Sequence, residues 1–169
     1  MSALNRWEGF LTLGGIGHRA PAAGTVASIA AIPFAWACHA LGGFWLMGPV
    51  TVAIAVLGYL GTRELLAARE TPDADPQEVV IDEVAGMMIA LWPLSIGLTV
   101  TGADWWVWPW PGVLAAFVLF RALDILKPPP INWCERAPGA VGVMLDDLVA
   151  GALSALIAAI AAGVAHGWF

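Results

Sequence analysis

The chain has 169 residues, about the length of one domain, and its composition differs from that of an ordinary soluble domain. Hydrophobic residues make up 60% and charged residues 12%, against roughly 45–50% and 25% in typical globular chains. This excludes intrinsic disorder, and the net charge of -6 excludes a basic surface for nucleic acid. The two cysteines, Cys38 and Cys134, are far apart and fit neither a disulfide scaffold nor a metal-binding spacing.

Five mainly apolar stretches predict helices long enough to cross a membrane. A single domain over residues 1–169 cannot hide so much apolar surface from water, so we expect an all-α, polytopic helical membrane protein forming one bundle. A soluble helical core is the alternative. The first stretch contains Pro33 and can be re-entrant, so the expected number of spans is four to five: 26–42, 49–66, 84–103, 110–127 and 148–166.

The charges predict how the bundle is oriented in the membrane. All seven Lys and Arg lie before the first span, at or after the end of the second, or at or after the end of the fourth, and every acid except Asp104 lies on the same side as they do. Because Lys and Arg mark the cytoplasmic side, we expect a cytoplasmic N-terminus and an external C-terminus. The tryptophans of segment 105–110 would form an interfacial belt on the other side. Polar chemistry confined to one face is untypical of a channel.

Two pairs of acids introduce the third and fifth predicted spans. Asp82-Glu83 precedes Gly86 and Asp146-Asp147 precedes Gly151, with an alanine before each glycine. Helix capping accounts for one acid at each helix, but not for two pairs beside hydrocarbon. Paired hard oxygen ligands suit Mg²⁺, which binds through a few carboxylates, waters and substrate phosphate. We therefore expect a site built from all four carboxylates.

A third cluster lies at the end of the fourth predicted span. Arg121, Asp124 and Lys127 recur every third residue and share one helical face, and the proline run after Lys127 ends the helix. An ion pair with a snorkelling lysine is the simpler interpretation. The functional one is a phosphate grip by Arg121 and Lys127, with Asp124 as a further ligand or base.

A glycine-rich segment near the N-terminus precedes the first predicted span. It runs from Gly14 to Gly24-Thr25, and its glycines let backbone N–H groups approach a phosphate at the following helix. A flexible entry loop explains the same residues equally well.

Together these motifs resemble the phosphatidylglycerophosphatase A family. The resemblance covers about Gly14 to Gly151 and is carried by four segments: Gly24-Thr25; Asp75-Pro76 through Val80-Ile81-Asp82-Glu83 with Gly86; Phe120-Arg121, Asp124-Ile125 and Lys127-Pro128; and Gly142 to Asp147 with Ala150-Gly151.

The resemblance implies a Mg²⁺-dependent phosphatase of the bacterial cytoplasmic membrane that converts phosphatidylglycerophosphate to phosphatidylglycerol at the cytoplasmic face. It implies metal binding and catalysis by the four paired carboxylates, with Asp124 also catalytic. It implies substrate binding by Arg121, Lys127, Gly24 and Thr25. The partners would be the phospholipid substrate and the membrane, with no nucleic acid, and homo-oligomerisation stays open. The alternatives are a CDP-alcohol-type phosphotransferase, or a small ion-binding transporter or membrane subunit.

Overall fold

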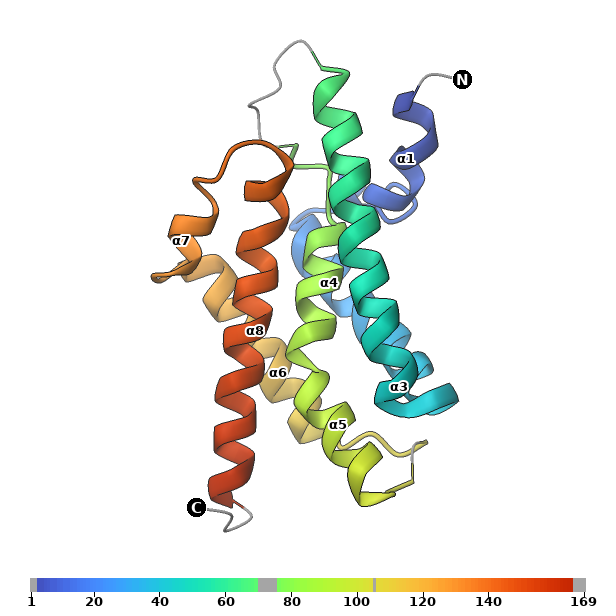
Figure 1. Cartoon of the computed structure of the whole chain (residues 1–169), viewed down its shortest axis with the longest axis vertical. Helices are drawn as coiled ribbons and strands as arrows, with labels where there is room; N and C mark the ends of the chain where they lie inside the picture. Colours follow the sequence, from blue (N-terminus) through green and yellow to red (C-terminus); the bar gives the residue numbers. More distant parts are fainter. Residues whose placement is uncertain (1–2, 70–75, 105, 166–169) are drawn as a thin grey trace.

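The computed structural model describes residues 3–69, 76–104 and 106–165, and this part of the chain forms α-helices joined by turns and loops, without strands (Figure 1). Asp75, Trp105 and the last residue of the fifth predicted span lie outside the described residues. The helices are α1 (Ala3–Leu11), α2 (Ile16–Arg19), α3 (Ala23–Ala67), α4 (Ile81–Ala90), α5 (Trp92–Thr101), α6 (Trp110–Leu126), α7 (Ile131–Cys134) and α8 (Ala140–Ala165). The expectation of an all-α bundle is confirmed.

Helix α3 reverses direction in its middle. Gly42 and Gly43 leave helical geometry, and Gly43 has φ of 60° and ψ of -153°, a conformation that only glycine adopts readily. The two arms, 23–41 and 44–67, therefore run in opposite directions, and the second arm passes α4 and ends beyond its start (Figure 1). Close approaches of Gly24 to Glu83 and of Gly58 to Ile81 agree with this arrangement. The turn predicted at these glycines is present.

The count of membrane-crossing helices is lower than predicted. Two helices, α3 and α8, are long and apolar enough to cross a bilayer, and the bent pair of α4 and α5 makes up to three. The sequence predicted four to five. Two features explain the difference: α3 is counted as one helix although its two arms run in opposite directions, and α6 has only 17 residues, the lower limit for a crossing.

Two predicted spans differ from the helices that replace them. The span predicted at 84–103 is two helices that meet at Leu91 with a bend of 42°, where Pro93 cannot donate a backbone hydrogen bond. The span predicted from residue 148 begins earlier, at Ala140, because the apolar residues before the acids continue the helix. Asp146 and Asp147 consequently lie inside α8 rather than at its start.

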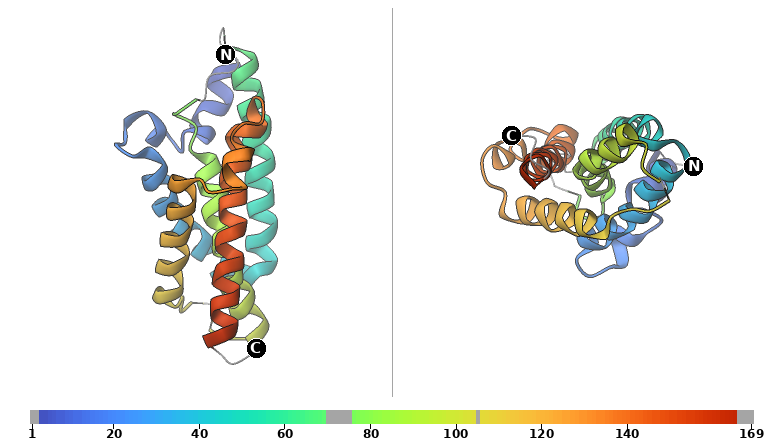
Figure 2. Two further views of the ribbon diagram at one scale, coloured as in Figure 1. Left: turned by 90° about the vertical axis from the view of Figure 1, so that its left-hand side faces the viewer. Right: turned by 90° about the horizontal axis from the view of Figure 1, so that it is seen from below.

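The core surrounds α4, the most buried helix of the bundle. The second arm of α3, α6 and α8 pack around it, and its side chains meet Phe120 of α6 together with Met144 and Ala150 of α8. The view along the bundle places α4 and α5 between α3 and α8 (Figure 2). Because α4 is held on several sides, the polar residues at its first turn are fixed in position.

Candidate active site

Helices α4 and α8 run side by side in the same direction and touch at two glycines. A Cβ atom on Gly151 would lie 2.3 Å from the carbonyl oxygen of Gly86, and one on Gly86 would lie 2.6 Å from that of Asp147. Small residues let helix backbones approach this closely. The crossing brings the acid pair of each helix to the same end of the bundle (Figure 1).

Three carboxylates from these helices converge. Asp82 and Glu83 stand in the first turn of α4, and Asp147 stands in α8; one oxygen from each lies within 4.8 Å of the others. Asp82 and Asp147 are buried, and Glu83 is half-buried. Within the described part of the chain, Glu83 Oε2 and Asp147 Oδ1 are buried without a hydrogen-bond partner. These two oxygens are therefore available to a ligand.

The mutual repulsion of these carboxylates indicates the charge of the ligand that would bind between them. Two charged carboxylate oxygens within 4.8 Å of each other repel by about 3 kcal/mol or more at an effective dielectric constant of about 20, and Asp124 adds a further negative neighbour to Asp147. Helix dipole stabilisation supports Asp82 and Glu83 in the first turn of α4, but not Asp147, which lies about two turns inside α8. A cation between them would offset this repulsion.

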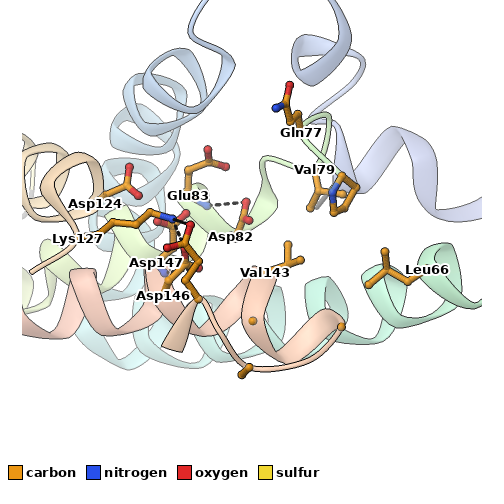
Figure 3. A pocket seen from close by; sticks show the side chains of 15 residues that line it. Leu66, Gln77, Val79, Asp82, Glu83, Asp124, Lys127, Val143, Asp146 and Asp147 are labelled. Atoms are coloured by element: carbon orange, nitrogen blue, oxygen red, sulfur yellow. Dashed lines mark hydrogen bonds and ion pairs between the residues drawn. The ribbon is translucent and has the colours of Figure 1, made fainter. Parts of the chain in front are cut away.

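Asp146 faces a different partner. Lys127 Nζ donates hydrogen bonds to Asp146 Oδ2 and to Glu135 Oε1, both at 2.8 Å. Lys127 ends α6 in the left-handed conformation, with φ of 43°, which turns its side chain away from the helix towards α8. Figure 3 shows the Lys127 side chain reaching Asp146 of α8. The fourth predicted ligand is thus paired with a lysine.

Arg121 and Asp124 form an ion pair on the other side of the carboxylates. Their closest atoms, Nη1 and Oδ2, are 2.7 Å apart. Among the described residues, however, Arg121 Nε and Nη1 are buried without a hydrogen bond of acceptable geometry. Gly24 completes this corner, because a Cβ there would lie 2.1 Å from Glu83 Oε1 and 3.4 Å from Arg121 Nη1. Its absence lets the carboxylate and the guanidinium approach the start of α3.

A cavity of about 360 Å³ opens beside these groups (Figure 3). Its polar lining includes Asp82, Glu83, Asp124, Lys127 and Asp146. It is large enough to take a phosphate group with its first waters, and it brings positive and negative groups to one wall.

The structure brings most of the predicted residues together but divides them into three places. Asp82, Glu83 and Asp147 form the trio, Lys127 and Asp146 form a pair across the cavity, and Arg121 with Asp124, Gly24 and Thr25 borders the start of α3. Arg121, Gly24 and Thr25 do not line the cavity itself. That these residues bind metal or substrate stays a prediction.

Sequence reasoning missed Glu135, the second acceptor of Lys127. It lies eight positions after Lys127 and beyond a proline run, so helical periodicity relates neither residue to the other. The one available signal was the proline run after Lys127. A proline run of this kind can reverse the chain and bring a following acid, here Glu135, back to the end of the preceding helix.

The loop before α4 is anchored by a second ion pair. Arg69 donates a hydrogen bond to Glu78, and the two side chains are only 27% and 24% exposed. Burial tends to raise the pKa of Glu78, but hydrogen bonds from its backbone and from Arg69 hold it below its ordinary value. A Cβ on Gly17 would meet the carbonyl oxygen of Glu78, so α2 packs closely on this loop.

Comparison with known proteins identifies the family. The family model described as phosphatidylglycerophosphatase A matches residues 9–162. A phosphatidylglycerophosphatase A of Escherichia coli is 36% identical over 133 residues, which is 78% of this chain and 69% of that protein. The Haemophilus influenzae protein of that name is 36% identical over 49% of this chain and 45% of its own length.

A third relative carries a different name. A Bacteroides thetaiotaomicron protein, named provisionally as a phosphatidylinositol-3-phosphatase, is 44% identical over 87 residues, or 52% of this chain and 49% of its own length. This chain thus spans about half the length of two of these three relatives. No solved structure matches the chain.

The family match extends over all the helices that build the site, from the last turns of α1 to the body of α8. It includes every residue of the carboxylate trio and of both ion pairs beside it. The expectations of a phosphatase family and of a membrane-associated helical protein are therefore confirmed: the chain belongs to the phosphatidylglycerophosphatase A family.

Proposed function

We propose that this protein hydrolyses the phosphate monoester of phosphatidylglycerophosphate, giving phosphatidylglycerol and inorganic phosphate, with Mg²⁺ as cofactor. The observation that carries the proposal is the trio of Asp82, Glu83 and Asp147, whose oxygens lie within 4.8 Å of one another beside a polar cavity. Family membership and the names of two relatives support the substrate.

The donor set fits Mg²⁺. All three groups are carboxylates, two of their buried oxygens lack a partner within the described residues, and Mg²⁺ prefers a few such ligands with water and phosphate completing its shell. Asp82, Glu83 and Asp147 would hold the ion. When bound, it would neutralise charge on the phosphate and lower the pKa of a bound water.

Two cationic side chains, Arg121 and Lys127, would stabilise the negative charge of the substrate phosphate. Phosphoryl transfer depends mainly on positioning and charge stabilisation. The guanidinium of Arg121 has five N–H donors, and its ion pair with Asp124 engages only Nη1, so in this proposal it donates to phosphate oxygens while Asp124 holds it in place. Lys127 faces the cavity from the other side. Asp146 and Glu135 hold its ammonium group in place, so in this proposal Asp146 positions Lys127.

The proposed location is the cytoplasmic face of the bacterial inner membrane. The carboxylate trio lies at the end of the bundle where α3 and α6 finish and where α4 and α8 begin (Figure 1). The basic residues Arg63, Arg69, Arg121 and Lys127 belong to the same end, and a concentration of Lys and Arg marks the cytoplasmic side. The substrate would reach this site laterally from that leaflet.

The decisive experiment measures inorganic phosphate released from phosphatidylglycerophosphate by the detergent-solubilised full-length chain. We expect release with Mg²⁺ and none after chelation. Wild-type protein that melts cooperatively but releases no phosphate would refute the proposal. Phosphate release also separates a phosphatase from a CDP-alcohol phosphotransferase and from an ion-binding membrane subunit, neither of which liberates phosphate from this lipid.

A second candidate substrate is phosphatidylinositol 3-phosphate, favoured by the Bacteroides relative. It too is a phosphate monoester on a lipid, so the same carboxylates and cations would act on it. The two lipids differ in the alcohol that leaves, a glycerol or an inositol ring. Assaying both under identical conditions, and comparing kcat/KM, assigns the substrate.

A further inference from the structure

A second cavity runs along the outside of the bundle between the first arm of α3 and α6. It is a groove of about 510 Å³, and its described lining is apolar or aromatic; the residues used below are Ile29, Ile32 and Trp36 of α3 and Val113, Leu114 and Phe117 of α6. Both helices lie on the same side of the bundle in the two views of Figure 2. We call it the α3–α6 groove.

One end of the groove lies close to the candidate active site, although the two cavities share no lining residue. On α6, Phe117, Leu114 and Val113 lie four, seven and eight residues before Arg121, a spacing that puts all four on one helical face. On α3, Ile29 lies five residues after Gly24, where an added Cβ would lie 3.4 Å from Arg121 Nη1. On both helices the groove therefore begins about one turn from residues of the candidate site.

The distance from Arg121 to the far end of the groove matches the thickness of one lipid leaflet. From Arg121 to Trp110 at its far end, α6 rises by about 16 Å, and half of a typical bilayer core is about 15 Å. Trp108 closes the far end by stacking on the buried His39, with ring centroids 6.0 Å apart. This aromatic pair therefore bounds the groove at the end away from the candidate active site.

We infer that the α3–α6 groove holds an acyl chain of the lipid substrate while its phosphate occupies the carboxylate site. The inference rests on the proposed function and extends it to the apolar part of the substrate. A chain seated there would orient the phosphomonoester towards Arg121 and the trio. Since lipid tails are as apolar as the groove, the gain is positioning and packing rather than hydrophobic transfer.

The test fills the groove and compares two substrates. Val113→Trp adds bulk to a groove-lining residue, and the matched control Val52→Trp adds the same bulk to a 53% exposed position on the second arm of α3, outside both cavities. We expect Val113→Trp to lower kcat/KM about tenfold for a long-chain phosphatidylglycerophosphate in mixed micelles. It should leave the rate on a soluble short-chain analogue, and the control's rate on both, near wild type.

The outcomes separate the groove from the proposed function. If wild type releases no phosphate from either substrate, the proposed function fails. If wild type is active and Val113→Trp loses both activities equally, or neither, the acyl-chain assignment is wrong. Photocrosslinking by a phosphatidylglycerophosphate with a mid-chain diazirine gives an independent readout on wild-type protein. Labelling should concentrate on segments 29–36 and 110–117, and labelling spread evenly over α8 would overturn the inference.

Discussion

The contact between α4 and α8 offers the sharpest test of how the carboxylate trio is assembled. In Gly151→Ala, the new Cβ would lie 2.3 Å from the carbonyl oxygen of Gly86 and 3.0 Å from its Cα. Ordinary van der Waals contact begins at 3.4 Å, so the two helices must separate by about 1 Å. The atoms involved are backbone, so no side-chain rotation can relieve the contact.

The separation should affect activity more than stability. Overpacking costs about 1–3 kcal/mol, while replacing a helical glycine with alanine returns about 1 kcal/mol of helix propensity. The net loss of stability is therefore at most about 2 kcal/mol. The same shift moves Asp147 away from Asp82 and Glu83, and a misplacement of 1 Å at a reacting centre costs about 10² in rate.

The assay is Mg²⁺-dependent phosphate release from phosphatidylglycerophosphate, with a Mg²⁺ titration and a thermal melt for each variant. The control is Gly97→Ala in α5, where an added Cβ would have nothing within 4 Å. We expect Gly151→Ala to lose about a hundredfold in rate and to need more Mg²⁺, while Gly97→Ala stays near wild type. If both variants show wild-type rates and Mg²⁺ midpoints, the trio does not depend on this contact and the metal assignment loses its geometric basis.

Three further predictions follow from the site and its surroundings. Asp147→Asn keeps the side chain's shape but removes charge from the trio; it should abolish Mg²⁺-dependent release without lowering the melting temperature, and an active variant would show that Asp147 is not a ligand. Arg121→Lys replaces a bidentate fork by a point charge and should cost about 10²–10³ in kcat, whereas the exposed Arg136→Lys should change little; equal small losses at both would reduce Arg121 to a boundary ion pair. Because the folded pKa of Glu78 is lowered, its pairing stabilises the fold above pH 4.5 and is lost as pH falls through the folded pKa, so the difference in melting temperature between wild type and Glu78→Gln should shrink on acidification from pH 6 to pH 3; a constant difference would contradict this.

The sequence alone determined the class of the protein and singled out the residues of its candidate site. Sixty per cent hydrophobic residues in a chain of this length can be accommodated only by helices facing lipid. The acids beside Gly86 and Gly151 stood out because carboxylates are costly near hydrocarbon and glycine is costly in a helix. Local composition carries both signals, so neither needs a contact between distant residues.

Only the tertiary structure decided which of these residues meet. Both acid pairs have the same local pattern, yet Asp147 joins Asp82 and Glu83 while Asp146 turns to Lys127. The reason is that adjacent residues of a helix point about 100° apart, so the rotation of α8 against α4 at Gly86 and Gly151 selects one acid for the trio. Helix rotation is set by packing across the whole interface, and no sequence spacing within α8 records it.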